Sequence, residues 1–343
     1  MKKSILIYVF FCLVIQVVNG RIYTGRCDTS KNKIYWELDT ETGNATISGK
    51  GKLPFINMFD GYIFDEALLP FIKHLSIEKG ITYLAEGSFN IYPNLESITI
   101  PSSVKIINHS IFSGCSKLVS VSLPPNLKEI EFMAFSGCSS LRSITIPGSV
   151  KKIHETAFSD CINLRSISVD PSNSVYDSRH GCNAIIETGS NSLIIGCIST
   201  NIPDDVERIG NRAFSGCSSL KSITIPGSVK EIGSGAFCVC SDLTSVILPE
   251  SLEKIGNEAF SGCSSLRSIT IPSSVKEIGE FIFAYSDGLT NVTVMCKNVP
   301  TLHTPFFRGV KNIKRNCVFQ VPSDCFSQYK STPFWKDLNI SSF

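Results

Sequence analysis

The heptapeptide Leu220-Lys-Ser-Ile-Thr-Ile-Pro226 recurs along the chain with only its second residue changed. The same pattern occupies 95–101, 141–147 and 266–272. A second marker, a phenylalanine that often follows alanine, repeats every 23 residues within each of two groups. The first group is Phe89, Phe112, Phe135 and Phe158, and the second is Phe214, Phe237, Phe260 and Phe283. A fixed period of this length predicts a solenoid in which each repeat forms one turn.

One repeat contains two segments that face its core. Apolar and polar residues alternate from Leu220 to Ile225, which predicts a strand with one buried face. Pro226 ends that strand, because proline has no N–H to donate within a sheet. Val229 and Ile232 then turn inward, and the Ala-Phe pair fills the centre from the far side. One turn cannot bury its own apolar face, so the turns must stack with parallel strands about 4.8 Å apart.

The two groups of phenylalanines are separated by an insertion. Phe158 and Phe214 are 56 residues apart, which is one repeat plus 33 further residues. The extra segment, 170–202, holds Asn183-Ala-Ile-Ile-Glu-Thr188 and Ser192-Leu-Ile-Ile-Gly-Cys197 on either side of a short turn. These apolar runs predict a β-hairpin. The hairpin either stands off the solenoid or pairs with its sheet.

Both ends of a solenoid need caps, because an open turn exposes core and unpaired strand. Residues 21–71 are the predicted N-terminal β cap, with a hairpin formed by 34–38 and 45–47. Eight repeats of about 23 residues are predicted over 72–296. The predicted C-terminal cap is 297–343. Segments 292–296 and 317–321 should close the sheet, and a short helix should follow at 323–329.

The first 20 residues predict a secretory signal peptide. Lys2 and Lys3 precede an apolar run of 14 residues, Ile5–Val18, which is shorter than the about 20 residues that span a bilayer. We expect cleavage before Arg21, and an uncleaved anchor is the alternative. No second stretch of this kind follows, so the sequence predicts a secreted or cell-surface protein with no membrane span.

The repeat unit resembles the BspA-like class of leucine-rich repeats, which occurs on surface and secreted proteins of bacteria and protozoa. The resemblance covers 72–338 and includes the insertion from Tyr176 to Cys197 and the ending from Val321 to Lys330 with Phe334–Asp337. It implies a leucine-rich repeat solenoid whose parallel sheet lies on the concave face. It also implies adhesion to host proteins or other cells, as in some members. Many members carry a membrane-spanning tail, and this sequence shows none.

Thirteen of the 14 cysteines lie beyond the predicted signal peptide. Six of them follow the repeat phenylalanine by three residues: Cys115, Cys138, Cys161, Cys217, Cys240 and Cys263. Stacked thiols that point the same way fit neither a tetrahedral metal site nor disulfide geometry, so we expect free, buried thiols. Bridges between Cys182 and Cys197 and between Cys296 and Cys317 are possible in an exported protein.

No motif predicts catalysis. The five histidines lack metal-ligand spacing, and the sequence contains no glycine-rich phosphate loop, zinc motif or calcium repeat. Asp177, His180 and Cys182 are close in sequence, but nothing activates them as a Cys-His pair. The net charge of +2 does not favour nucleic acid. We therefore expect no enzymatic activity, no cofactor, no metal and no nucleic-acid partner.

The strand residues between the buried ones should face solvent and offer hydroxyl groups to a partner. They are Ser97, Thr99, Ser120, Ser122, Ser143, Thr145, Ser166, Ser168, Ser222, Thr224, Ser268 and Thr270. Ser245 and Ile247 take the corresponding outward positions of one further strand. A basic stripe of Arg142, Arg165, Lys221 and Arg267 should run beside them. The alternative is a solvated sheet with no ligand. Adjacent Lys and Glu pairs such as Lys128-Glu129 are interpreted as a solvated edge of little energetic weight.

The sequence thus predicts a monomeric, adhesin-like recognition protein that binds an extracellular or host protein, or an anionic glycan, through its sheet face. The alternative is a structural coat or matrix component without a specific ligand. An enzyme with an unrecognised site is a third and weaker hypothesis. Four N-glycosylation sequons would be acceptors in a eukaryote: Asn44, Asn108, Asn291 and Asn339.

Overall fold

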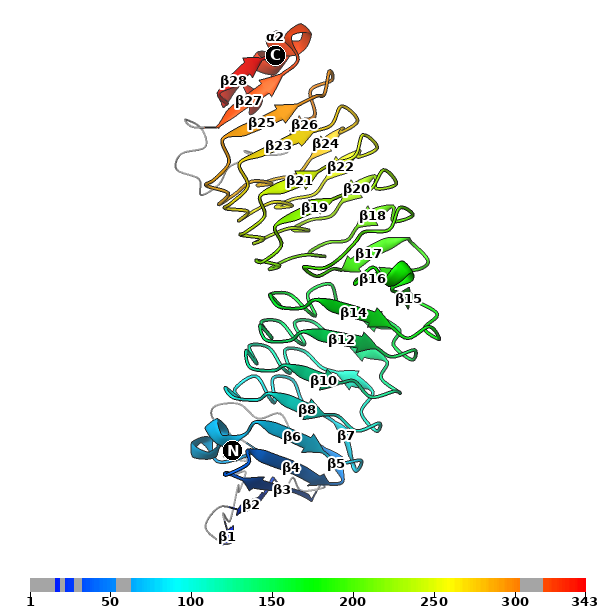
Figure 1. Ribbon diagram of the computed structural model, residues 1–343, viewed down its shortest axis with the longest axis vertical. Coiled ribbons are helices and arrows are strands. Elements are labelled where there is room, and N and C mark those ends of the chain that lie inside the picture. Colours follow the sequence, from blue (N-terminus) through cyan, green and yellow to red (C-terminus); the bar gives the residue numbers. More distant parts are fainter. Residues whose placement is uncertain (1–15, 19–21, 28–32, 54–62, 303–316) are drawn as a thin grey trace, which may run out of the picture. The chain divides into compact units, whose positions relative to one another are not determined.

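The structure is a computed structural model that describes residues 16–18, 22–27, 33–53, 63–302 and 317–343. It divides into two compact units, Met1–Ala157 and Phe158–Phe343. Each unit is a stack of turns, here called rungs, with short parallel strands on two sides (Figure 1). We call the sheet that contains the repeated heptapeptide the front sheet, and the sheet of mostly two-residue strands that follows it the back sheet.

The front sheet of the first unit begins with antiparallel strands and continues with parallel ones. Its order is β1 (Gln16–Val18), β2 (Ile22–Arg26), β3 (Ile34–Asp39), β4 (Asn44–Gly49), β6 (His74–Ile77), β8 (Ser97–Thr99) and β10 (Ser120–Ser122). The antiparallel pair β3 and β4 confirms the predicted N-terminal hairpin. Most of the predicted signal peptide, 1–20, lies outside the described residues, and only β1 falls within it.

The other elements of the first unit complete its rungs. The 3-10 helix η1 (Glu66–Phe71) precedes β6, β5 (Gly51–Lys52) pairs with β7 (Ile81–Tyr83), and β12 (Ser143–Ile146) lies beyond β10. The back sheet contains β9 (Ile106–Ile107), β11 (Glu129–Ile130) and β13 (Lys152–Ile153), paired in parallel.

The second unit has the same two sides. Its front strands are β14 (Ser166–Val169), β19 (Ser222–Thr224), β21 (Ser245–Ile247), β23 (Ser268–Ile271), β25 (Asn291–Val294), β27 (Val318–Val321) and β28 (Ile340–Ser342). Its back sheet is β15 (Tyr176–Asp177), β16 (Ile185–Glu187), β17 (Ser192–Ile195), β18 (Arg208–Ile209), β20 (Glu231–Ile232), β22 (Lys254–Ile255), β24 (Glu277–Ile278) and β26 (Thr301–Leu302).

The insertion is part of the back sheet. Strands β15, β16 and β17 are antiparallel, and β17 then pairs in parallel with β18, with Leu193 opposite Ile209. The predicted hairpin is confirmed, and of its two possible placements the structure has the one paired with the sheet. Arg179, in the 3-10 helix η2 (Arg179–Gly181), holds the insertion in place. Its guanidinium donates to Asp177 at 2.7 Å and to Asp205 at 2.7 Å.

Two buried columns link successive rungs. The repeat phenylalanines stack, with ring centroids 5.6 and 5.2 Å apart from Phe89 to Phe135 and 5.0 and 5.3 Å apart from Phe214 to Phe260. Beside them the thiol of Cys138 donates to the carbonyl of Phe112 at 3.2 Å, and Cys263 does the same to Phe237 at 3.2 Å. Ser286 continues this column with a hydroxyl. All six column cysteines are buried, as predicted, and none of them forms a disulfide.

The C-terminal end is closed by aromatic side chains. Strands β25 and β27 pair in parallel, which confirms the predicted closing strands. After them come η3 (Ser323–Cys325), α2 (Phe326–Ser331) and η4 (Trp335–Asp337). Tyr329 and Trp335 are fully buried, and the Tyr329 hydroxyl donates to the carbonyl of Cys296 at 2.7 Å. No helix in the described ranges has the length and apolar character to cross a membrane.

Candidate functional site

The front sheet presents the predicted hydroxyl side chains to solvent in each unit. Ser97 and Ser168 are half-exposed, and the other ten predicted serines and threonines are exposed. Their alternation with buried residues follows from the period of two along a strand. The register of β19 and β21 places Ser222 beside Ser245 and Thr224 beside Ile247. The apolar Ile247 therefore interrupts a row of hydroxyl groups.

The predicted basic stripe is not continuous within the second unit. Lys221, Arg165 and Arg267 are exposed there, and Arg142 lies in the first unit. The N–H of Thr244 donates to the carbonyl of Lys221 at 2.8 Å, so a threonine stands between Lys221 and Arg267. The segment stacked next to Arg165 belongs to the insertion and not to the rung of Lys221, because the N–H of Ile198 donates to the carbonyl of Leu164. The second unit thus spaces its cations apart.

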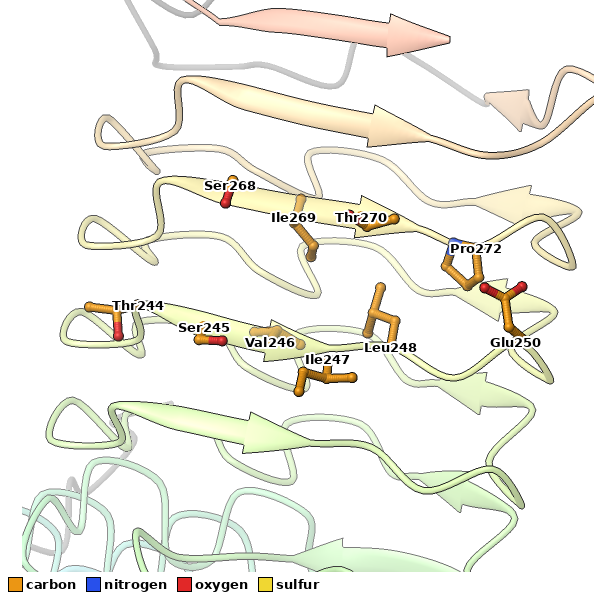
Figure 2. Close-up of a pocket in the computed structure, with 10 residues that line it drawn as sticks. All are labelled: Thr244, Ser245, Val246, Ile247, Leu248, Glu250, Ser268, Ile269, Thr270 and Pro272. Atoms are coloured by element: carbon orange, nitrogen blue, oxygen red, sulfur yellow. The ribbon is translucent and has the colours of Figure 1, made fainter. Parts of the chain in front are cut away.

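A groove opens in the front sheet of the second unit. Strand β21 pairs with β19, and β23 pairs with β25, but β21 and β23 are neighbours that do not pair. The groove between them has a volume of about 250 Å³. Figure 2 shows Ser245 and Ile247 along β21, Ser268 and Thr270 along β23, and Leu248, Pro272 and Glu250 beyond the carboxyl ends of the two strands.

The gap coincides with a change in the sequence of the rung. Four rungs end their front strand with Ile-Pro, at 100–101, 146–147, 225–226 and 271–272, and Ile225 and Ile271 are buried. The β21 rung instead has Leu248-Pro249, and Leu248 is half-exposed. The first unit repeats the pattern, because Leu123-Pro124 follows β10, Leu123 is half-exposed, and β10 does not pair with β12. A γ-branched leucine fits the pleated interior less well than β-branched isoleucine. Both interruptions thus coincide with Leu-Pro at the end of a front strand.

The chemistry of the groove suits binding. Val246 and Ile269 form a buried apolar floor, and the Ile247 side chain is 58% exposed. Hydroxyl groups of Thr244, Ser245, Ser268 and Thr270 lie around it, and Glu250 is the one ionisable side chain among the described residues that line it. Sequence reasoning placed Ser245, Ile247, Ser268 and Thr270 on the outward face of their strands, but it did not identify Leu248 or Glu250. The Leu-Pro dipeptide was the available signal.

Comparison with known proteins then identifies the family. A family model described as a BspA type leucine-rich repeat region, in six copies, matches residues 60–182 and 194–314. The chain belongs to the BspA-type leucine-rich repeat family. A search of curated protein sequences gave no match.

Solved structures share the fold of this BspA-type chain. A leucine-rich repeat protein from Eubacterium ventriosum aligns with a TM-score of 0.62 and 22% identity over 88% of this chain and 78% of its own. A leucine-rich cell surface protein from Faecalibacterium prausnitzii gives 0.57 and 22% over 92% and 95%. The pneumococcal vaccine antigen PcpA gives 0.63 and 20% over 92% and 98%. At these identities the likeness establishes the fold.

Two observations argue against the Cys-His pair considered from sequence. The carboxylate of Asp177 accepts hydrogen bonds from Arg179, the residue that holds the insertion in place. Burial raises the pKa of the Cys182 thiol, which makes it a poor nucleophile at neutral pH. Among the described residues, no group of three or more His, Cys, Asp and Glu side chains is placed to hold a metal ion.

The four cysteines suggested for bridges are free thiols in the structure, so neither bridge is formed there. Cys182 and Cys197 lie in the insertion, and the Cys197 thiol donates to the carbonyl of Asn183 at 3.3 Å. Burial raises the pKa of Cys296 to about 11 and that of Cys317 to about 12.

The four sequons differ in accessibility. Asn44 and Asn339 are exposed. Asn291 is half-exposed, and its amide donates to Gln320 at 3.3 Å on the neighbouring strand. Asn108 is buried, and its amide donates to the carbonyl of Leu84 at 2.6 Å. A glycan on Asn108 would have to break that bond and displace the packing around it.

Proposed function

We propose that this chain is a non-catalytic recognition protein at the cell surface or outside the cell, and that it binds a protein partner through the front sheet of its second unit. The observation that carries the proposal is the groove between β21 and β23, with Ile247 exposed beside it. The family supports a repeat scaffold, and the similar structure from Faecalibacterium prausnitzii is described as a cell surface protein.

The composition of the groove favours a protein over a glycan as its ligand. Binding is favoured when a partner's side chain covers an exposed apolar side chain and the apolar floor beside it, because apolar surface is then removed from water. The surrounding hydroxyl groups can donate to and accept from a partner's main chain. A protein surface that presents an aliphatic or aromatic side chain among amide groups meets both requirements. A sulfated glycan would leave Ile247 uncovered and would bring its charge near Glu250.

The test changes the groove without changing the fold. Ile247→Thr restores the residue that Thr224 and Thr270 provide in neighbouring rungs, so the variant should fold normally. Parent and variant would be compared for binding to a panel of immobilised extracellular-matrix proteins, with circular dichroism as the folding control. We expect the parent to bind at least one of them, and Ile247→Thr to weaken that binding about tenfold or more, as for a residue central to an interface.

A matched variant shows whether the groove is specifically involved. Tyr285 is 59% exposed on a turn of the same unit, outside the groove. Tyr285→Ser should leave binding unchanged. Equal losses from both variants would contradict the proposal. A parent that binds no protein but self-associates as its concentration rises would support the structural-coat alternative instead.

A further inference from the structure

Three lysines of the first unit stack at the edge of the back sheet, each at the residue before a back strand. The N–H of Lys128 donates to the carbonyl of Lys105 at 2.7 Å, and the N–H of Lys151 donates to the carbonyl of Lys128 at 2.8 Å. Lys105, Lys128 and Lys151 therefore occupy one position on three successive rungs, and all three are exposed. We call them the lysine column. Their backbones are separated by one strand spacing, about 4.8 Å.

The second unit fills the same position with alternating charges. Glu207, Lys230, Glu253 and Lys276 are joined by the same backbone bonds, at 2.9, 2.8 and 2.8 Å. Lys276 and Glu253 form an ion pair at 2.6 Å. The adjoining column, Arg208, Glu231, Lys254 and Glu277, also alternates, with ion pairs at 3.4 and 3.5 Å. Each charge in these two columns of the second unit therefore has an opposite charge on a neighbouring rung.

The lysine column departs from that pattern, and this should lower the stability of the sheet. Like charges directly opposite on neighbouring strands destabilise a sheet, whereas opposite charges stabilise it. In the first unit one change, Lys128→Glu, would restore alternation. The adjoining position of the same rungs does contain opposite charges, because Lys152 pairs with Glu129 at 3.5 Å and with Glu131 at 3.0 Å. The unit thus combines opposite charges in one column and repeats the same charge in the next.

We propose that the lysine column is a binding site for a linear sulfated glycan. Three exposed cations in a row at the strand spacing create a local positive potential that the net charge of +2 does not reveal. Lysine is a point charge on a flexible stem and can follow sulfates without a fixed fork geometry. Single-stranded nucleic acid needs aromatic side chains on which bases stack. The column next to the lysines holds Ile106, Glu129 and Lys152, and the aromatic rings further along the same rungs, His109, Phe132 and His154, pack against one another. This site is separate from the groove of the second unit.

Heparin is the probe for the first test. Lys128→Glu should weaken binding of the full chain to heparin at least tenfold near 0.1 M salt, because it reverses the central charge of the column. Its melting temperature should equal or exceed that of the parent, which excludes unfolding as the cause. Lys117→Glu makes the same charge change at another exposed lysine of the first unit. It should reduce binding by less than twofold.

A second variant tests whether three stacked lysines are sufficient to create a heparin site. Glu253→Lys places a third lysine between Lys230 and Lys276 of the second unit, and we expect it to add a heparin site and raise the measured stoichiometry. Binding of Lys128→Glu equal to that of the parent, or an equal loss with Lys117→Glu, would overturn the proposal. So would a Glu253→Lys variant with no added site. Single-stranded DNA or polyglutamate that binds the column as tightly as heparin would overturn the choice of a sulfated glycan.

Discussion

The two units have the same buried residues and differ in what they expose. Both stack phenylalanines at similar distances and place thiols against the preceding rung. On the back sheet, however, the first unit has three lysines where the second alternates lysine and glutamate. Only the second unit contains the insertion. The buried positions therefore determine the rung, and the exposed positions can acquire separate functions in each unit.

The largest expected effect tests whether the cores are equivalent. Phe112→Ala in the first unit and Phe237→Ala in the second each remove a fully buried ring between two stacked neighbours. Each should lower the free energy of unfolding by about 3–5 kcal/mol. Urea denaturation of both variants would measure this, with Phe237→Leu as a milder control. A cost under about 1 kcal/mol in one unit alone would show that the two cores are not equivalent.

A smaller effect should be confined to the second unit. Arg179→Ala removes the charged hydrogen bonds to Asp177 and Asp205, which should cost about 1–2 kcal/mol after allowance for the exposed partners. Arg179→Lys keeps the charge but loses the two-pronged contact, so it should recover only part of the stability. Proteolysis within the insertion, monitored with urea denaturation, would report the loosening. An insertion equally resistant in all three forms would show that other contacts hold it.

The contact between Arg179 and Asp205 also predicts that the stability it provides depends on pH. The Arg179 guanidinium lowers the pKa of Asp205 below its ordinary value. A carboxyl group whose pKa is lowered on folding contributes stability above its unfolded pKa, about 3.9, and loses it as the pH falls through the folded pKa. The difference in stability between the parent and Arg179→Ala should therefore be constant near neutral pH and shrink below about pH 4.

Much of the fold could be predicted because the rungs are nearly identical. The 23-residue period identified the solenoid, and inward-facing Ile and Phe residues identified its core. The terminal hairpin, the insertion hairpin and the buried thiols followed from local patterns. Each of these depends on residues near one another in sequence, or on one repeat copied at a fixed interval.

The candidate sites depend on pairing between rungs, which a single repeat does not reveal. Leu248 differs little from isoleucine in composition, yet it coincides with an interrupted sheet. Within one repeat, Lys128-Glu129 looks like a neutral pair. Alignment at the 23-residue period places Lys128 between Lys105 and Lys151, and the register of the back sheet confirms that the three stack. Similarly, the sequon at Asn108 gives no sign that its amide is buried.

A backbone difference between individual rungs allows a test with opposite signs. Gly137 and Val239 occupy the same position, two residues after the repeat phenylalanine, with φ of 74° and 60°. Valine is strained there by about 1–2 kcal/mol. Val239→Gly should stabilise the protein by up to about 1 kcal/mol after the entropic cost of glycine, and Gly137→Val should destabilise it. Thermal unfolding of both variants would measure this, and equal signs would refute the interpretation.

The smallest expected effect concerns the charge columns. Lys128→Glu should stabilise the protein by a few tenths of a kcal/mol, and Glu253→Lys should destabilise it by a similar amount. Both differences should largely vanish at 1 M salt, where the Debye length is about 3 Å. Thermal melts at low and high salt would test this. A stabilising effect of Glu253→Lys at low salt would contradict the account of why alternation is favoured.

The interrupted front sheets also have a mechanical consequence. At the level where β21 and β23 separate, the back strands β22 and β24 remain paired, with Lys254 opposite Glu277. The first unit repeats this, because β11 and β13 are paired behind the gap between β10 and β12. At these levels each unit keeps strand pairing in its back sheet and loses it in its front sheet. Each unit should therefore bend more easily in the direction that spreads its unpaired front strands. In the second unit this bending widens the groove.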